Sequence, residues 1–250
     1  MTVVPFDLKG RTALVTGGAS GIGAAVVELL VSLGVTVCST DIVGGDDDLR
    51  GDVASATDVG RITSAALARM GTIDVLVNSA GIAETLVPTV EQTPQAWQRV
   101  IDINLTGTFL MCQAVGAGMV ARKRGAIINI ASIVGLGGFP RRNAYGAGKA
   151  AIINLTRSLA SEWGGSGVRV NCVAPGYIRT PMVVTLVEEK KLDVGRLERR
   201  TPLGRLGDPG EIAQAIAYLA SDWASYVNGA TLAVDGGWSA FGGAGDVATA

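Results

Sequence analysis

Three side chains in the middle of the chain, Ser132, Tyr145 and Lys149, have the types and spacing of an acid–base site. Tyr145 and Lys149 are four residues apart, so on a helix they lie on one face. Tyrosine, with an ordinary pKa of about 10, transfers protons poorly near neutral pH. A neighbouring ammonium favours the phenolate and lowers that pKa. Such a phenol could protonate a carbonyl oxygen or deprotonate an alcohol while the Ser132 hydroxyl holds the same oxygen.

Each of these residues also has an ordinary explanation. Tyr145 could be a half-buried packing residue and Lys149 a solvated one, so their spacing alone does not establish a site. Just before them, Arg141 and Arg142 are predicted to be surface or interface charges. The alternative for these arginines is contact with a polar or anionic substrate at the mouth of a site.

A glycine-rich turn near the start of the chain supports the interpretation of Ser132, Tyr145 and Lys149 as an acid–base site. Gly17, Gly18, Gly21 and Gly23 separate a short apolar stretch, 12–15, from an apolar-striped run. Strand, glycine turn and helix together aim backbone N–H groups and the positive end of a helix dipole at a phosphate. Glycine is needed there because a Cβ would hold a diphosphate away from the backbone. The spacing differs from the commoner G-x-G-x-x-G fingerprint, so the turn alone is a weak indication.

The next apolar stretch, 35–41, ends in a carboxylate, Asp41. In dinucleotide sites an acidic side chain at about this distance from the glycine turn accepts hydrogen bonds from the adenosine ribose. It would also repel a 2′-phosphate, so Asp41 predicts NAD rather than NADP as the cofactor. The alternative is that Asp41 only starts the turn at Gly44 and Gly45.

Strand and helix patterns alternate along the whole chain, without internal repeats or a linker. This predicts one α/β domain, 1–250, with a doubly wound, Rossmann-like, mainly parallel sheet and helices on both faces.

Thr93 before Pro94, and Asp208 three residues before Glu211, are expected helix starts. A mobile helical flap is expected at about 177–206, a solvated acidic loop at 46–48 and a Gly/Ala-rich tail at 239–250. Strands are predicted over 12–15, 35–41, 49–53, 73–77, 126–131, 168–173 and 230–234, and helices over 54–70, from 94 and from 104, and over 143–163 and 212–219.

Composition narrows the functional classes. With 48% hydrophobic residues, the chain can build a large core. Its low content of charged residues, 17%, suggests surfaces covered by other subunits. A net charge of −1 argues against binding nucleic acid. The absence of histidine excludes histidine triads and most zinc sites, so no metal is expected.

Location is predicted to be cytoplasmic. The three cysteines are odd in number and far apart, which is typical of reduced core residues. Residues 1–9 lack the pattern of a secretory signal. The uncharged stretch 103–121 is interrupted by polar residues and glycines, so we expect a helix buried between its own sheet and a partner subunit rather than a membrane span.

Together these motifs resemble the short-chain dehydrogenase/reductase family, in the branch with subunits of this size, over residues 8–238. Ser79 is a departure, since asparagine is commoner there in the family. The resemblance rests on T-G-G-A-S-G-I-G at 16–23, Asp52-Val53, N-S-A-G at 78–81, Asn104, Ser132, Tyr145-x-x-x-Lys149 and Pro175-Gly176.

The resemblance implies a role for each motif. Tyr145 would be the acid/base and Ser132 would orient the substrate oxygen. Lys149 would bind the nicotinamide ribose and lower the pKa of the tyrosine, and Asn104 would hold a water in a proton relay. Family members are usually tetramers or dimers, joined through helices near 104–120 and 143–162. Cofactor contacts are expected from Gly17, Ser20, Gly21, Ile22, Gly23, Asp41, from Asp52 and Val53 beside the adenine, from Asn78 beside a ribose, from Ala80, Gly81, Tyr145 and Lys149, and from Pro175, Gly176, Ile178 and Thr180 beside the nicotinamide.

The function implied is interconversion of a secondary alcohol (a sugar, polyol or other hydroxy compound) and a ketone with NAD(H). The alternative within the family is a 3-oxoacyl-carrier-protein reductase. Asp41 argues against it, because such reductases generally use NADPH, and 163–167 lack a basic residue for docking an acidic carrier. Arg122 and Arg124 could dock one on another side. A dinucleotide sensor without turnover is disfavoured because both Tyr145 and Lys149 are present.

Overall fold

The structure is a computed structural model and describes residues 7–44, 49–243 and 245–247. Within them, six strands form one sheet in which every neighbouring pair is parallel. The order β2-β1-β3-β4-β5-β6 means that the chain winds outward from β1 in both directions, which confirms the predicted doubly wound, Rossmann-like sheet. The strands are β1 (Thr12–Thr16), β2 (Thr36–Thr40), β3 (Val75–Asn78), β4 (Gly125–Ile130), β5 (Val168–Pro175) and β6 (Thr231–Val234).

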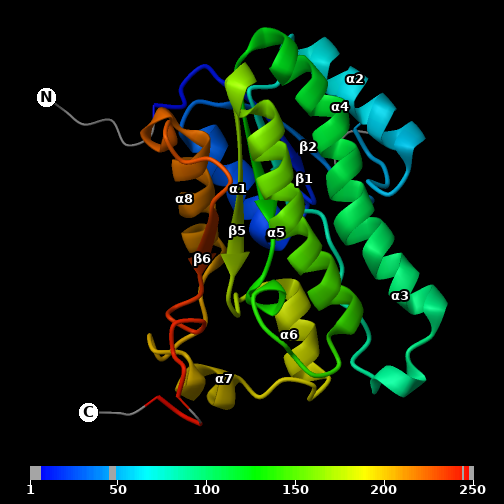
Figure 1. The fold of residues 1–250 in the computed structure, drawn as a ribbon, viewed down its shortest axis with the longest axis vertical. Helices are drawn as coiled ribbons and strands as arrows, with labels where there is room; N and C mark the ends of the chain where they lie inside the picture. Colours follow the sequence, from blue (N-terminus) through cyan, green and yellow to red (C-terminus); the bar gives the residue numbers. More distant parts are fainter. Residues whose placement is uncertain (1–6, 45–48, 244, 248–250) are drawn as a thin grey trace, which may run out of the picture.

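Helices cover both faces of this sheet (Figure 1). They are α1 (Gly21–Ser32), α2 (Ala56–Met70), α3 (Pro94–Ile101), α4 (Gly107–Arg122), α5 (Asn143–Trp163), α6 (Pro181–Glu188), α7 (Val194–Arg200) and α8 (Pro209–Ala220). One buried cluster joins α1 and α8 to one face, and a second joins α2, α4 and α5 to the other. Because side chains alternate along a strand, β1 supplies Ala13 and Val15 to the first cluster and Leu14 to the second.

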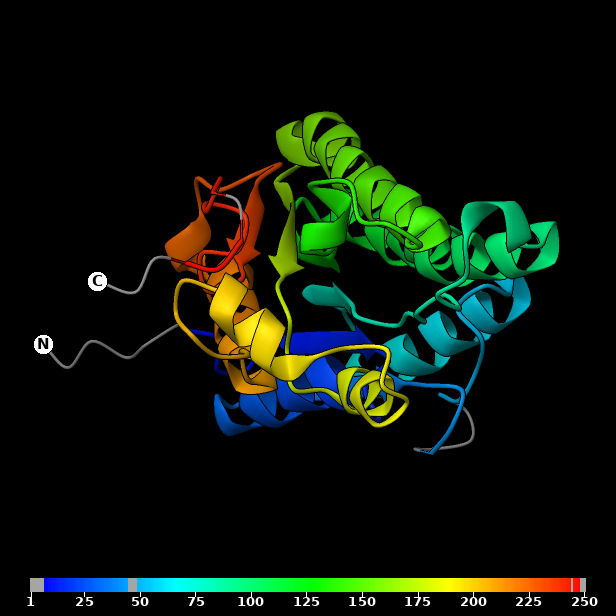
Figure 2. The ribbon, with the colours of Figure 1, turned by 90° about the horizontal axis from the view of Figure 1, so that it is seen from below.

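All the strands end at the same edge of the sheet, where α6 and α7 lie (Figure 1). Figure 2, seen from that side, shows the two helices in front of the sheet. The expected flap is therefore helical, and its mobility stays a prediction. Shorter helical turns are Thr89–Glu91, Ile133–Gly135, Gly164–Ser166 and Asp222–Ala224.

One predicted strand, 49–53, is wrong. Leu49 and Val53 are apolar because they are buried in the cluster around α2 and α4. The backbone between them bonds elsewhere: Gly51 N–H donates to the Asp41 carbonyl and Asp52 N–H to the Asp58 carboxylate. β2 therefore remains the outermost strand. The acidic loop predicted at 46–48 lies outside the described residues.

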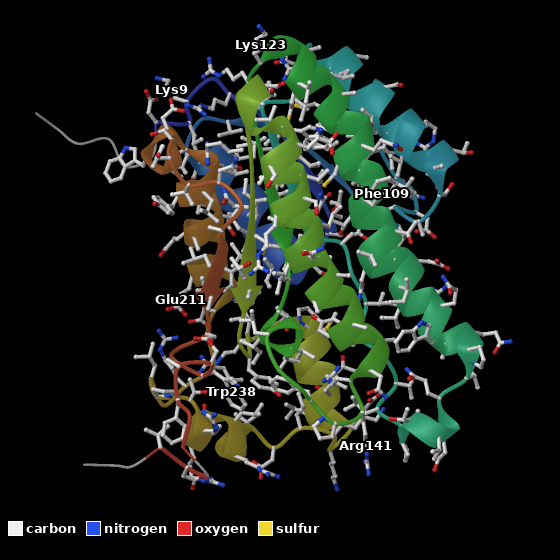
Figure 3. The ribbon with its side chains drawn as sticks, viewed as in Figure 1. Lys9, Phe109, Lys123, Arg141, Glu211 and Trp238 are labelled. Atoms are coloured by element: carbon white, nitrogen blue, oxygen red, sulfur yellow. The ribbon has the colours of Figure 1, made fainter. Side chains whose placement is uncertain are left out.

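The uncharged stretch forms the centre of a long helix, Pro94–Arg122, in which a π-helical turn, Asp102–Thr106, joins α3 to α4. Among the described residues this helix is the one long and apolar enough to cross a membrane, a test that buried core helices also pass. Met111 and Met119 are fully buried, whereas Phe109 is 42% exposed (Figure 3). Its inner face thus packs on the sheet, and coverage of the outer face by a partner stays a prediction.

Two predicted helix starts are confirmed. The Thr93 hydroxyl accepts from the Ala96 N–H at 3.2 Å, which caps α3. Asp208 and Glu211 form the reciprocal capping box of α8. The three cysteines are buried and form no disulfide.

Candidate active site

A cavity of about 320 Å³ lies where the strands end, beside the point at which the winding diverges. In doubly wound sheets this position receives the ligand. Three of the predicted site residues, Gly23, Asn78 and Asn104, do not line it. The others do: Gly17, Ser20, Gly21, Ile22, Asp41, Asp52, Val53, Ala80, Gly81, Ser132, Tyr145, Lys149, Pro175, Gly176, Ile178 and Thr180.

The turn between β1 and α1 has the shape of a phosphate cradle. Gly17 has a φ of +68°, and a Cβ there would lie 2.8 Å from Ala80. A Cβ on Gly23 would lie 2.0 Å from the Gly17 carbonyl oxygen, so Gly23 holds the turn against α1 from behind. Ser20 caps α1 without a side-chain hydrogen bond, which leaves the first N–H groups of the helix for an anion. These features fit a dinucleotide diphosphate.

The carboxylate of Asp41 stands beside this turn. One of its oxygens accepts from the Ala19 N–H at 3.1 Å and the other from the Ile42 N–H at 2.8 Å. These bonds fix the side chain while leaving lone pairs for ribose hydroxyls. Farther along the cavity Asp52 is exposed and Val53 is buried. This end fits the adenosine half of a dinucleotide.

Ser132, Tyr145 and Lys149 converge at the other end. Ser132 follows β4, is 8% exposed and accepts from the Val134 N–H at 3.2 Å. It also hydrogen-bonds the Tyr145 phenol. The Lys149 ammonium is buried, donates to the Ile130 carbonyl at 2.7 Å, and lies 5.5 Å from the centre of the Tyr145 ring. The geometry thus unites a proton donor, a hydroxyl and a cation.

Burial dominates the pKa values of this group. It raises the pKa of Tyr145, while the hydrogen bond with Ser132 and the charge of Arg142 lower it. Burial also lowers the pKa of Lys149 to about 8, since a buried ammonium loses hydration. The direction for Tyr145 is opposite to the one predicted, because the cost of burying a phenolate exceeds what its neighbours supply. A bound oxidised nicotinamide, being positively charged, would favour the phenolate.

The side chains of the two asparagines predicted at the site bond to the framework of the fold. Asn78 is 3% exposed and donates to the Asn129 side chain at 2.9 Å and to the Cys112 sulfur at 3.3 Å, which ties β3 to β4 and α4. Asn104 accepts from the Ile82 N–H at 2.8 Å and donates to the Ile82 carbonyl at 2.9 Å. Its side chain therefore fixes the loop that follows β3. Asn78 does not line the cavity, and its place beside a ribose stays a prediction.

Glu84 is a positioning residue that the sequence patterns did not indicate. It is 6% exposed, and its two oxygens accept from the Ala144 and Tyr145 N–H groups, each at 3.1 Å. A third bond comes from the Gln92 side chain at 2.8 Å. A carboxylate at the start of α5 satisfies N–H groups that lack helical partners and matches the helix dipole. Glu84 thereby anchors the turn that carries Tyr145.

The region near α6 and α7 contains contacts that the sequence patterns do not indicate. Tyr177 packs edge-on against Trp238 with ring centres 5.0 Å apart. Trp238 directly precedes the expected tail. The Arg200 guanidinium lies 4.9 Å from the Trp238 ring and donates to the Phe241 carbonyl, which holds the start of the tail in place. Cavity residues absent from the prediction are Thr40, Ile42, Gly51, Ser79, Ile82, Arg99, Ile103, Ile130, Ala131, Pro181, Met182 and Val183.

Comparisons with known proteins agree with this geometry. A family model described as enoyl-(acyl carrier protein) reductase matches residues 17–239. The cis-4-hydroxycyclohexanecarboxylate dehydrogenase of Sinomonas cyclohexanicum is 45% identical over 92% of this chain and 97% of its own length. The chain is a short-chain dehydrogenase/reductase. It is also 39% identical to the 3-oxoacyl-[acyl-carrier-protein] reductase of Thermotoga maritima, over 92% of this chain and 98% of that protein.

A solved structure of the same family gives the cofactor class. A NAD(P)-dependent gluconate 5-dehydrogenase from Beutenbergia cavernae, described as putative and containing NADP at low occupancy, superposes with a TM-score of 0.88. The two are 36% identical over 95% of this chain and all of that one. Another relative, an uncharacterized short-chain type dehydrogenase/reductase of Sinorhizobium fredii, is longer, and the chain spans 44% of its length. This short-chain dehydrogenase/reductase therefore uses a nicotinamide dinucleotide.

Proposed function

We propose that this enzyme interconverts a secondary alcohol and a ketone by hydride transfer with NAD(H), with Tyr145 as the acid/base. The observation that carries the proposal is the cavity that joins Ser132, Tyr145 and Lys149 at one end to the glycine turn and Asp41 at the other. The similarity to a hydroxycyclohexanecarboxylate dehydrogenase supports the substrate class. Asp41 supports NAD, because its carboxylate would repel a 2′-phosphate.

In alcohol oxidation the Tyr145 phenolate oxygen takes the proton of the substrate hydroxyl. A bound nicotinamide supplies the hydride acceptor for this direction and the donor for the reverse. Ser132 accepts from Val134 and directs its own O–H to the phenol, from which that O–H can turn to the substrate oxygen. Lys149, held by the Ile130 carbonyl, supplies positive charge beside the phenol and a donor toward a ribose.

The alternative is a 3-oxoacyl-carrier-protein reductase, supported by the similarity to the Thermotoga maritima enzyme. A carrier-borne substrate would require a basic surface near the mouth of the cavity. The two activities separate in one assay: reduced-nicotinamide absorbance with a panel of secondary alcohols and with an acyl-carrier substrate, each with NAD and NADP in parallel. Turnover of alcohols with NAD supports the proposal. Turnover confined to 3-oxoacyl carriers with NADPH would replace it with the alternative.

A further inference from the structure

Arg142 is the N-cap residue of α5 and lies three residues before Tyr145, which lines the substrate end of the cavity. Its guanidinium carbon lies 5.9 Å from the centre of the Tyr145 ring. Its charge lowers the pKa of Tyr145 and also that of Tyr177, which follows β5. A cation that acts on both phenols lies close to the space between α5 and the end of β5.

The charge of Arg142 has no protein anion to balance it. In the part of the chain that the structure describes, its side chain forms neither an ion pair nor a hydrogen bond, although it is half-buried. Arg11, Arg199 and Arg205, by contrast, each pair with a carboxylate. The buried carboxylate of Glu84 already accepts three hydrogen bonds. A partly desolvated guanidinium in this state favours an incoming anion.

Asp41, a carboxylate that lines the cavity, lies several strands away from Ser132. Asp41 follows β2, whereas Ser132 follows β4, three strands away and so roughly 14 Å across the sheet. Near the phenol, Lys149 and Arg142 carry positive charge, and the Glu84 carboxylate is held by the Ala144 and Tyr145 N–H groups. Apolar residues line the same cavity, among them Ile130, Ala131 and Ile178. The substrate end thus combines a positive charge with an apolar surface.

We infer that the substrate of this enzyme carries a carboxylate as well as the reacting alcohol, and that Arg142 binds that carboxylate. The inference rests on the proposed function and makes the reaction hydroxy acid to oxo acid. The carbinol C–H leaves as hydride to the nicotinamide, the O–H proton passes to Tyr145, and the carboxylate is unchanged. A guanidinium holds a carboxylate through two parallel hydrogen bonds, which would orient the carbinol carbon toward the phenol.

The neighbouring arginine provides a matched control. Arg141 is exposed, has a φ of +63°, and points away from the body of the molecule (Figure 3). It carries the same charge one residue away, so replacing it tests whether net charge alone matters.

The test compares acids with their neutral esters. kcat/KM is measured with NAD for 4-hydroxycyclohexanecarboxylate and 3-hydroxybutyrate and for the methyl ester of each. We expect the wild type to prefer at least one acid, and Arg142→Ala to lower that acid-to-ester ratio about 10- to 100-fold, as for a lost charged hydrogen bond. Arg141→Ala should leave the ratio unchanged. Esters used as well as acids, or a ratio unaffected by Arg142→Ala, would overturn the inference.

Binding gives a second readout that needs no turnover. Calorimetry with cyclohexanecarboxylate, which lacks the reacting hydroxyl, should show binding to the wild type with NAD and loss of it in Arg142→Ala. Equal binding by both proteins, or none by the wild type, would contradict the role of Arg142. Absence of turnover with every alcohol would instead refute the proposed function. Retained NAD binding by Arg142→Ala shows that the variant is folded.

Discussion

The two ends of the cavity are built in different ways. At the diphosphate end, Gly17, Gly23 and Asp41 lie within 25 residues of one another, and their contacts follow from one strand–turn–helix unit. At the substrate end, Glu84 bonds to the N–H of Tyr145 across 61 residues. Tyr177, at the start of the flap, packs edge-on against Trp238, beyond the end of the flap. Local geometry therefore determines where a cofactor lies, and long-range packing determines what reacts.

The largest effect at the diphosphate end should come from Gly23→Ala. The new Cβ would lie 2.0 Å from the Gly17 carbonyl oxygen, so the turn must move and the phosphate cradle is lost. We expect NAD affinity to fall by more than about tenfold and stability by about 1–3 kcal/mol. Gly60→Ala is the control: it lies within α2 with open space around it and should raise stability slightly. Calorimetry with NAD that finds unchanged affinity in Gly23→Ala would contradict this assignment.

At the substrate end, Glu84→Ala should impair catalysis more than cofactor binding. It leaves the Ala144 and Tyr145 N–H groups without their acceptor, which costs about 1–3 kcal/mol and frees the turn carrying the phenol. We expect kcat to fall about 10- to 100-fold at a temperature well below melting, with little change in Kd for NAD. Glu84→Gln, which keeps one acceptor oxygen, should recover part of the loss.

A merely structural role for Glu84 would give a different pattern. The melting temperature would fall, while kcat of the folded enzyme would stay near that of the wild type. Glu91→Ala, a change to an exposed carboxylate in the turn Thr89–Glu91, serves as the matched control and should alter neither quantity.

The difference between the two ends also separates the features that the sequence predicts from those that it does not. The sheet, the helix starts and the positions of Gly17 and Asp41 at the cavity follow from local patterns and spacing. Glu84 was not foreseeable, because nothing in its neighbourhood signals a bond to a helix 60 residues later. The sequence predicts a strand over 49–53 because burial against α2 and α4 makes this loop as apolar as a strand. The pKa of Tyr145 likewise depends on burial, which spacing does not reveal.

Substitutions at the adenosine end alone should change the preference between NAD and NADP. Asp41→Ala combined with Ile42→Arg removes the carboxylate and places a guanidinium on a side chain that is 62% exposed at the cavity. We expect the NADP-to-NAD ratio of kcat/KM to rise at least roughly tenfold, since a charged hydrogen bond to the 2′-phosphate replaces repulsion. Initial rates with both cofactors measure it. Ratios equal to those of the wild type would refute the ribose role.

A smaller, diagnostic effect concerns pH. Oxidation requires the phenolate, and burial raises the pKa of Tyr145, so kcat/KM for the alcohol should rise with pH on the alkaline side. The hydrogen bond from Ser132 lowers that pKa. Ser132→Ala should therefore lower the rate and also move the rising limb of the pH profile to higher pH. A limb displaced to lower pH would contradict the assignment.

The central claim is that the Tyr145 phenol performs the proton transfer beside a bound nicotinamide. The most direct measurement is reduced-nicotinamide formation by the wild type and by Tyr145→Phe, together with the Kd of each for NAD. The account predicts a loss of turnover of about 10²- to 10⁴-fold with nearly unchanged NAD affinity. Turnover by Tyr145→Phe at the wild-type rate would contradict it.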